Sequence, residues 1–348
     1  MKIGFKKLEK QPIRNVNFHQ KQYDFYVEQY DFYINKNRVK DLPLQEITDS
    51  LTIVSITNLL KWYCFILAHK TVTTKDYNIA FLEYALSYLK QGFYSDVPTV
   101  QIYFQIYNAL KTGDIQYYEL LKKQLETAFD LFPIDEIRSI LLLTINFCIR
   151  KLNAGEKPFL KEAFNWYKQG FETKVLLKNE EISRFAYNNV IIIAMKIEEF
   201  EWTKSFIENY KNYIAEPYRH DTYYFNLALW YEYQKQYDEV LKLLRKVEFN
   251  DVLQTLHSKV ILLRIYYELE EMKALESLLD SIKIYLYRHK KLGYHKDNYL
   301  KLIQFTKRLI RLNPHDKTEK KAFLEIVENE NSLLLKSWFL EQVQNRTN

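Results

Sequence analysis

The side chains with most potential for nucleophilic or metal chemistry in this sequence are two cysteines and seven histidines. Cys64 and His69 lie five residues apart, which would allow a thiolate–imidazole pair, but no activating third group is evident. Cys64 and Cys148 both fall within apolar runs of helical periodicity, so we expect buried, reduced thiols and no disulfide. His289 and His295 flank a loop that offers no third metal ligand, so we expect solvated histidines there.

Acidic pairs and phosphate-binding loops are the other features that could support a reaction. The adjacent acidic residues sit at expected helix starts or turns, where they suit the helix dipole or simple solvation. These pairs are Asp135/Glu136, Glu180/Glu181, Glu198/Glu199 and Glu270/Glu271. The patterns HExxH, CxxC, GxSxG and GxxxxGK[ST] are all missing, and six glycines are too few for a phosphate-cradling loop. We therefore expect a protein that is not an enzyme and uses no metal or cofactor.

The composition limits the class of protein. The chain has 348 residues, of which 47% are hydrophobic and 16% aromatic, so it can bury a large core and is not disordered. Six glycines and seven prolines are too few for a turn-rich all-β fold. The start, MKIGFKKLEK, has no apolar stretch typical of a secretory signal, and Lys61 interrupts the most membrane-like segment, residues 50–68. We expect a soluble, cytoplasmic protein.

The elements that position these side chains are predicted to be about fourteen α-helices. Tyr and Phe usually favour strands, but here they recur at spacings of three and four, as in YFNLALWYEY. Breakers fall where helices should end or begin. Glycines that follow helical runs are Gly92, Gly113, Gly155, Gly170 and Gly293; prolines that precede or open them are Pro43, Pro98, Pro133, Pro158 and Pro314. The fold class is predicted to be all-α.

The helices are expected to form pairs. Comparable positions at the start of each second helix are Tyr77, Ile115, Leu160, Phe200, Tyr237 and Met272. Their spacings are 38, 45, 40, 37 and 35 residues, which converge on a helix–turn–helix repeat of about 34. Such a repeat lets one core extend along an axis beyond the size of an ordinary domain.

Three successive units carry the pattern of a known repeat. From Phe225 to Val247, Leu227 and Ala228 take the helix-crossing positions and Tyr231 the packing aromatic position. The next unit gives Leu263, Tyr266, Met272, Leu275, Leu279 and Ile282, and the preceding one gives Ile191, Ala194, Phe200, Thr203, Ile207 and Tyr210. The sequence thus resembles the tetratricopeptide-like repeat family over residues 180–290. It departs from that family at Val240, Leu275 and Thr203, where alanine is usual.

Beyond the general repeat, the chain resembles a group of large bacterial repeat proteins that have no assigned function. The stretches that carry this resemblance are 131–155, 200–214, 263–290 and 298–312. Members of that group often have an additional N-terminal region, so residues 1–40 are expected to correspond to the middle of a longer relative. The resemblance implies a right-handed superhelix, or α-solenoid, of tetratricopeptide-like hairpins. We expect an N-terminal helical segment at 1–40, repeats at 41–290 and basic capping helices at 291–348.

Charge is concentrated near the C-terminus. Residues 283–321 hold twelve Lys or Arg and three Asp or Glu, a local charge of +9 that exceeds the net +6 of the chain. We define the basic patch as Arg288, Lys290, Lys291, Lys307, Arg308 and Arg311. One interpretation is a capping segment whose lysines stabilise helix ends. The other is a surface for an acidic partner or a nucleic-acid backbone, with interleaved tyrosines as stacking platforms.

The repeat register predicts a second surface. Stacked helix pairs present their first helices to a concave groove that suits peptides or partner helices. The groove residues are predicted to be Asn188, Lys196, Tyr233, Arg264 and Tyr267. Asn and Lys there resemble part of the carboxylate-gripping set of peptide-binding relatives, whereas ordinary packing between repeats is the alternative. The sequence predicts a non-enzymatic interaction scaffold for a protein or peptide, with nucleic-acid binding by the basic patch as the alternative function.

Overall fold

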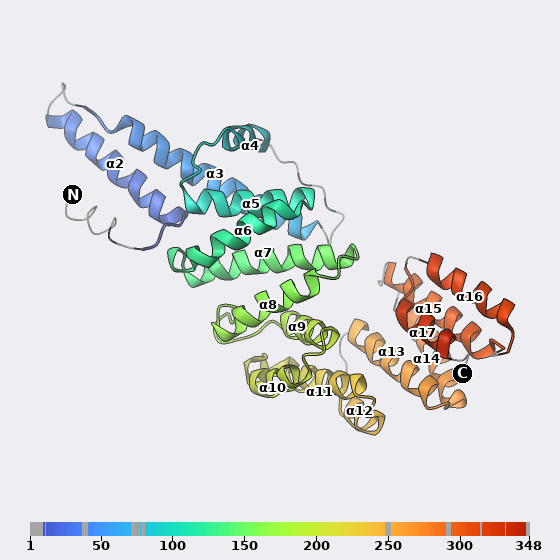
Figure 1. The fold of residues 1–348 in the computed structure, drawn as a ribbon. Helices are drawn as coiled ribbons and strands as arrows, with labels where there is room; N and C mark the ends of the chain where they lie inside the picture. The colour runs from blue at the N-terminus through green and yellow to red at the C-terminus, as the bar shows by residue number, and fades with distance from the viewer. Residues whose placement is uncertain are drawn as a thin grey trace. The chain divides into compact units, whose positions relative to one another are not determined.

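The computed structural model describes residues 10, 12–36, 41–70, 75, 77, 81–247, 252–289, 294–313, 315–330 and 332–345. Within these ranges the chain forms sixteen α-helices and two short 3-10 helices, without a β-strand (Figure 1). The predicted all-α class is confirmed. The chain divides into two compact units, Met1–Ala215 and Glu216–Asn348, which we call unit 1 and unit 2.

Unit 1 contains nine of these α-helices in its described part. They are α2 (Val16–Lys36), α3 (Leu44–His69), α4 (Leu82–Lys90), α5 (Pro98–Thr112), α6 (Ile115–Ala128), α7 (Ile134–Asn153), α8 (Phe159–Glu172), α9 (Arg184–Lys196) and α10 (Phe200–Tyr210). The 3-10 helices η1 (Phe129–Leu131) and η2 (Lys211–Tyr213) extend α6 and α10. Two isolated bridges, Lys178 with Glu181 and Ile182 with Ile214, order the connection that follows α8.

Unit 2 contains the remaining helices. They are α11 (Glu216–Tyr233), α12 (Tyr237–Leu244), α13 (Val252–Glu268), α14 (Met272–Arg288), α15 (Tyr294–Arg311), α16 (Lys317–Asn329) and α17 (Lys336–Asn345). The boundary between the units, after Ala215, falls inside the region predicted to hold repeats. The predicted divisions at residues 40 and 290 remain predictions.

Proline and glycine delimit helices largely as the sequence predicts. Pro98 is the first residue of α5, and Pro43, Pro133 and Pro158 precede α3, α7 and α8 as N-cap residues. Gly92, Gly113 and Gly155 follow helices with positive φ. The prediction was wrong for Gly170, which lies inside α8, where Leu176 packs so closely that a Cβ would meet its side chain at 2.6 Å. Gly293 and Pro314 lie outside the described residues.

The predicted starts of the second helices can be compared with the structure. Helices α6, α10, α12 and α14 begin at Ile115, Phe200, Tyr237 and Met272, as predicted, and α8 begins one residue before Leu160. The prediction for Tyr77 was wrong, because the next helix, α4, begins at Leu82. The Tyr77 hydroxyl lies 2.6 Å from Nδ1 of His69 and its ring packs edge-on against the imidazole, so Tyr77 is held at the end of α3 instead.

Four helix pairs are joined by the same kind of turn. In the α7–α8, α9–α10, α11–α12 and α13–α14 connections, one residue takes a positive φ: Gly155, Glu198, Lys235 and Glu270. The next amide then donates back to a carbonyl five residues earlier: Glu156 to Lys151, Glu199 to Ala194, Gln236 to Tyr231 and Glu271 to Tyr266. This bonding satisfies carbonyls at the helix end. Glycine supplies the left-handed residue only in the first of the four turns.

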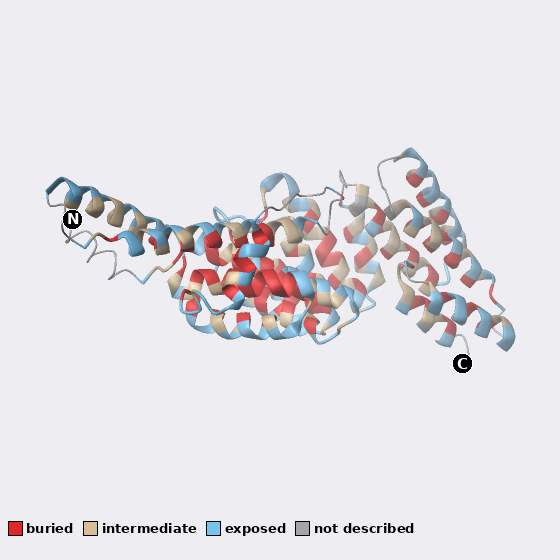
Figure 2. Cartoon of the chain, turned by 90° about the horizontal axis from the view of Figure 1, so that it is seen from above, coloured by how far each residue is buried: buried red, intermediate tan, exposed pale blue. Residues whose placement is uncertain are grey.

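The core of unit 1 is centred on α5. From Thr99 to Leu110 all but one of the α5 residues are buried, so this helix is enclosed on nearly every side, whereas α2 buries only Phe18 and His19 (Figure 2). Glu136, at the start of α7, is buried and accepts hydrogen bonds from Nδ2 of Asn15 (3.0 Å) and the Tyr103 hydroxyl (3.1 Å). The segment before α2 is therefore tied to α5 and α7 through a single carboxylate.

One hydrophobic cluster of unit 2 is shared by helices α13 to α17. Its fully buried members are Leu256, Leu263, Leu275, Leu279, Ile282, Leu286, Leu302, Leu309, Phe323, Val327 and Phe339. Helix α17 contributes Trp338, Phe339 and Val343, so the C-terminal helix is an integral part of this core. Burial of this apolar surface is the main stabilising contribution to the unit.

Within the described ranges, α3 is the one helix that is long and apolar enough to span a bilayer. Its most apolar window has a mean hydropathy of 1.6, and 33% of that window is buried inside the chain. A core helix can meet the same criteria of length and composition. The cytoplasmic location predicted from the sequence therefore remains a prediction.

Candidate binding site

The predicted groove residues differ in accessibility. Lys196 is exposed at the end of α9 and Asn188 is half-buried in the same helix, in unit 1. Tyr233, Arg264 and Tyr267 belong to unit 2, where Tyr233 is 39% exposed at the end of α11. Tyr267 is buried, and its ring packs edge-on against Trp338 of α17 with ring centroids 5.1 Å apart. Lys196 and Tyr233 are thus the accessible members of this set.

Arg264 forms an ion pair within unit 2. Its Nη2 lies 2.5 Å from Oε1 of Glu232 on α11, and the Glu232 side chain is only 7% exposed. Burial raises the pKa of Glu232, which Arg264 opposes and the neighbouring Glu268 reinforces. Burial raises the pKa of the Tyr233 hydroxyl and the nearby Arg264 opposes that rise, so the structure brings these two predicted groove residues together. Sequence reasoning did not find Glu232, because a charged side chain on a helix normally faces water.

Glu268 extends this polar cluster toward the C-terminal helix. Its Oε2 accepts a short hydrogen bond from the Tyr237 hydroxyl, and its Oε1 accepts one from Nε1 of Trp338 at 3.2 Å. Burial, together with Glu268, raises the pKa of the Tyr237 hydroxyl. The cluster therefore connects α11, α12, α13 and α17. The contacts that the structure describes for this cluster lie within unit 2, so the Arg264 guanidinium is already paired inside the unit.

The basic patch contains both paired and free cations. Lys307 is half-buried and pairs with Asp280 of α14 at 3.2 Å, while the Arg308 guanidinium lies 5.3 Å from the centre of the Phe323 ring. Arg288 and Arg311 are exposed and form no ion pair within the described part of the chain. Lys290 and Lys291 lie outside the described residues. The exposed positive charge of the described patch is thus carried by Arg288, Arg308 and Arg311.

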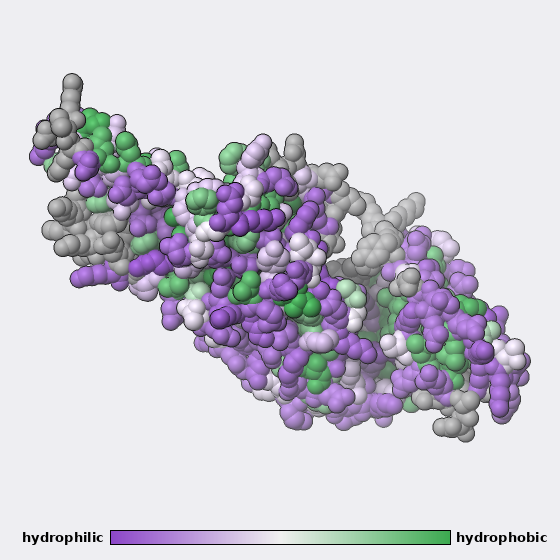
Figure 3. All heavy atoms as spheres, turned by 45° about the horizontal axis from the view of Figure 1, so that its top comes forward, coloured by the Kyte–Doolittle hydropathy of each residue, from purple (hydrophilic) through white to green (hydrophobic). Residues whose placement is uncertain are grey.

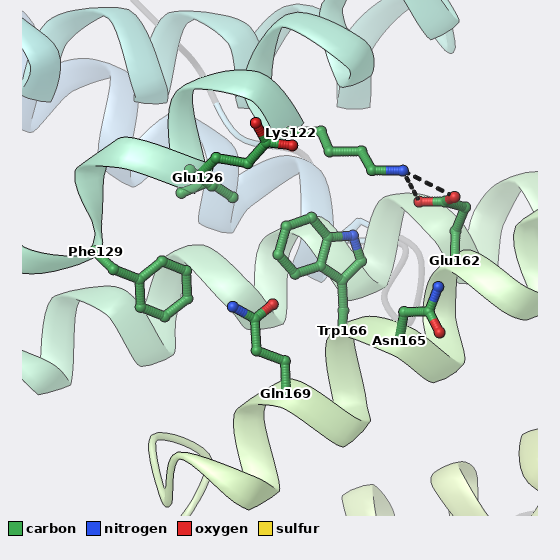
Figure 4. Close-up of a pocket in the computed structure, with 8 residues that line it drawn as sticks. Lys122, Glu126, Phe129, Glu162, Asn165, Trp166 and Gln169 are labelled. Carbon is green, nitrogen blue, oxygen red and sulfur yellow. Dashed lines mark hydrogen bonds and ion pairs between the residues drawn. The ribbon is translucent and has the colours of Figure 1, made fainter.

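A pocket that the sequence did not predict lies in unit 1 between α6 and α8. It has a volume of about 180 Å³ and is lined by Lys122, Leu125, Glu126, Phe129, Glu162, Asn165, Trp166 and Gln169. In Figure 4 the Trp166 indole extends from α8 toward α6, between Phe129 on one side and the Lys122–Glu162 pair on the other. We call this the α6–α8 pocket.

At one edge of the α6–α8 pocket the polar side chains hydrogen-bond to one another. Nζ of Lys122 donates to both carboxylate oxygens of Glu162 at 3.0 and 2.9 Å. Glu162 also accepts from the Tyr118 hydroxyl at 2.5 Å, and that hydroxyl accepts from Nε1 of Trp166 at 2.9 Å. Although burial opposes the shift, the pKa of Glu162 is lowered because Tyr118 and Lys122 hydrogen-bond to the charged carboxylate. The ammonium and carboxylate at this edge therefore satisfy each other.

The other polar groups of the α6–α8 pocket are free. The Glu126 carboxylate and the side-chain amides of Asn165 and Gln169 are exposed, and none forms a hydrogen bond or ion pair with a described residue. The rings of Phe129 and Trp166 carry no cation among the described side chains. The pocket thus combines one unpaired negative charge with two aromatic rings and two amides.

Large aromatic side chains are also exposed on α3 and at the start of α4. Trp62 is 64% exposed, Phe81 68% and Tyr84 75%, and α4 packs against α3 (Figure 1). Phe81 takes a left-handed φ of 73°, which is uncommon for a bulky residue. Elsewhere the face seen in Figure 3 is mostly hydrophilic, with hydrophobic side chains in small separate groups.

The structure also tests the expected reactive groups. Cys64 and Cys148 are buried and form no disulfide, as predicted. Burial raises the pKa of the Cys148 thiol to about 12 and raises that of Cys64 as well. Among the described residues, no group of three His, Cys, Asp or Glu side chains is arranged to hold a metal ion.

Comparison of the chain with protein-family models, with curated proteins and with solved structures finds no match. The resemblance to tetratricopeptide-like repeat proteins therefore rests on the sequence pattern and stays a prediction.

Proposed function

We propose that the chain is a non-enzymatic scaffold for protein–protein interaction, built as a right-handed superhelix of tetratricopeptide-like helical hairpins. The recurring turn supports this architecture: its left-handed residues Glu198, Lys235 and Glu270 are spaced by 37 and 35 residues and close with the same hydrogen bond. Repeats of this size stack into arrays that present extended binding surfaces. The proposed ligand is a peptide or a partner helix, and the proposed location is the cytoplasm of a bacterium.

The observation that carries the binding function is the exposure of Trp62, Phe81 and Tyr84 in unit 1. Leaving such rings in water costs free energy, since each can bury a large apolar area. Tyr and Trp are enriched at the centres of protein interfaces because they combine a rigid apolar ring with one polar group. We therefore assign the principal contact surface to α3 and α4. Among the groove residues, Lys196 and Tyr233 remain proposed contacts.

Selection of a random-peptide display library against the intact chain tests this proposal and does not require that the partner be identified. We expect enrichment of related apolar peptides, and weaker binding of those peptides to a Trp62→Ser/Tyr84→Ser variant. Phe185→Ser is the matched control, because Phe185 is 65% exposed in the same unit but lies on α9. Failure to enrich any family of peptides would contradict the proposed function. Equal binding by the double variant would contradict the assigned surface.

The predicted groove is tested separately with Lys196→Glu, whose side chain is exposed. Arg264→Glu is unsuitable for this purpose. It would place a third carboxylate beside Glu232 and Glu268, so a loss of binding would report damage to unit 2.

Nucleic-acid binding is the second candidate, and the free, exposed Arg288 and Arg311 favour it. Binding to phosphate would release counterions and weaken with salt, by a slope of about one per phosphate contact. Titration of labelled single- and double-stranded oligonucleotides at increasing salt tests this function. Absence of association at low salt excludes it. If association occurs, Arg288→Ala/Arg311→Ala should reduce the slope by about two, and Lys307→Ala by less, because Lys307 pairs with Asp280.

A further inference from the structure

The α6–α8 pocket has the size of a site for one side chain. Its volume is about 180 Å³, whereas pockets for drug-sized molecules span roughly 300–1,000 Å³. A cavity of about 150 Å³ is enough to hold benzene. The α6–α8 pocket can thus admit a single planar group on a flexible stem, but not a cofactor.

The charge of the α6–α8 pocket favours a cation. Lys122 and Glu162 neutralise each other through two hydrogen bonds, which leaves Glu126 as the unpaired charge. The faces of aromatic rings carry partial negative charge and attract cations placed over them. Of the two rings that line the pocket, Phe129 is half-buried and Trp166 is only 7% exposed, so Phe129 offers the more accessible ring. The carbonyl oxygens of Asn165 and Gln169 can accept hydrogen bonds from the same group.

We propose that the α6–α8 pocket binds the guanidinium group of an arginine side chain from a partner polypeptide. A guanidinium is planar, so it stacks on an aromatic ring while its five N–H donors reach a carboxylate and amide oxygens at once. An ammonium is a compact, strongly hydrated charge that cannot stack in this way. Guanidinium is therefore the cation that can use a carboxylate, an aromatic ring and an amide oxygen of this pocket, and Figure 4 shows Glu126, Phe129 and Gln169 on the same side of Trp166.

The ligand is assigned to a polypeptide because the pocket has no free cation for the α-carboxylate of free arginine. Among the described residues, Lys122 is the only lysine or arginine that lines the α6–α8 pocket, and both oxygens of Glu162 already accept from it. Within a peptide that carboxylate is an amide and needs no partner. The proposal that the arginine belongs to a partner polypeptide rests on the proposed scaffold function. Binding of the guanidinium itself is tested with a small molecule.

The test is a titration of the intact chain, labelled with ¹⁵N at tryptophan, with Nα-acetylarginine N-methylamide. The chain has five tryptophans, and loss of one indole signal in Trp166→Phe identifies Trp166. We expect the Trp166 signal to shift saturably with the arginine probe. The neutral isostere Nα-acetylcitrulline N-methylamide should cause no shift, and the lysine analogue and free arginine should bind more weakly. An equal response to citrulline or to lysine would overturn the guanidinium assignment, and tighter binding of free arginine would overturn the polypeptide assignment.

Substitutions that neutralise one acidic side chain in or next to α6 provide a second test of the site. Glu126→Gln should weaken the arginine probe roughly five-fold, the change in affinity expected for one exposed ion pair. Asp130→Asn is the matched control, because Asp130 is an exposed acidic residue of η1, which follows α6, and does not line the pocket. Equal effects of the two variants, or no shift of Trp166 in the original chain, would overturn the site. Such a failure leaves peptide selection by the intact chain unaffected, so the two proposals fail separately.

Discussion

Glu232 and Arg264 form an ion pair between α11 and α13 in which one carboxylate oxygen lies 2.5 Å from the guanidinium. The pair is incompletely satisfied, since Oε2 of Glu232 and Nε of Arg264 have no hydrogen-bond partner in the described structure. A buried pair of this kind contributes little compared with apolar packing, but removing one member leaves an unpaired buried charge. Removing one member of the pair should therefore lower the stability of unit 2 measurably.

Arg264→Met should destabilise unit 2 by about 2–3 kcal/mol, because Glu232 would lose its counter-charge while it remains buried. Hydrogen exchange of the α11 and α13 amides measures this locally, without requiring that the whole chain unfold in one step. Arg245→Met, at an exposed position after α12, is the matched control and should change stability by less than about 0.5 kcal/mol. The double change Glu232→Leu/Arg264→Met should restore most of the loss. A double variant as unstable as the single one would show that Arg264 acts through packing.

The raised pKa of Glu232 predicts a pH dependence with a definite sign. Because this pKa is higher in the folded chain than in the unfolded chain, the unfolded chain gives up the proton first as pH rises. The contribution of Glu232 to stability is therefore present below the ordinary glutamate pKa and is lost as pH rises through the folded value. Hydrogen exchange of α11 between about pH 4.3 and neutrality should show this decline. In Glu232→Gln the decline should be smaller, and an unchanged slope would assign it to another group.

Local sequence signals were sufficient to predict several helix boundaries. The starts at Ile115, Phe200, Tyr237 and Met272 coincide with breaks in hydrophobic periodicity, which depends on residues three and four apart. The prediction for Tyr77 failed because its position is set by a contact with His69 outside the helix. That for Gly170 was wrong for a related reason: a glycine is also needed where another side chain packs against a helix, and the sequence does not distinguish the two uses.

The candidate sites could not be predicted in the same way. Lys122 and Glu162 are 40 residues apart, and Glu268 and Trp338 are 70 apart, so each contact depends on how helices pack. The sequence identified Arg264 as a residue of interest but could not show that Glu232 pairs with it. Conversely, Cys64 and Cys148 were placed correctly because burial follows from the apolar run that contains each of them.

The buried thiols should be unreactive in the folded chain. The raised pKa values of Cys64 and Cys148 leave almost no thiolate near neutral pH, and neither side chain is accessible. Intact-mass measurement after iodoacetamide treatment at pH 8 should show no added group, and both thiols should react in denaturant. Ser87→Cys, on the exposed face of α4, is the positive control and should add one group. Modification of Cys148 at the rate of that control would contradict its burial.

The recurring turn supplies a prediction about the repeat itself. Lys235 holds a φ of 56° without being glycine, a conformation that costs about 1–2 kcal/mol for residues with a Cβ. Lys235→Gly should therefore stabilise the α11–α12 hairpin by roughly 0.5–1 kcal/mol, after the entropy of glycine in the unfolded chain is subtracted. Lys235→Ala should give little change and Lys235→Val a loss, as measured by hydrogen exchange of α12. Lys242→Gly, inside α12, removes the same side chain where φ is helical and should destabilise. If both glycine variants destabilise α12, glycine relieves no backbone strain at residue 235. The turn would then no longer support the repeat architecture.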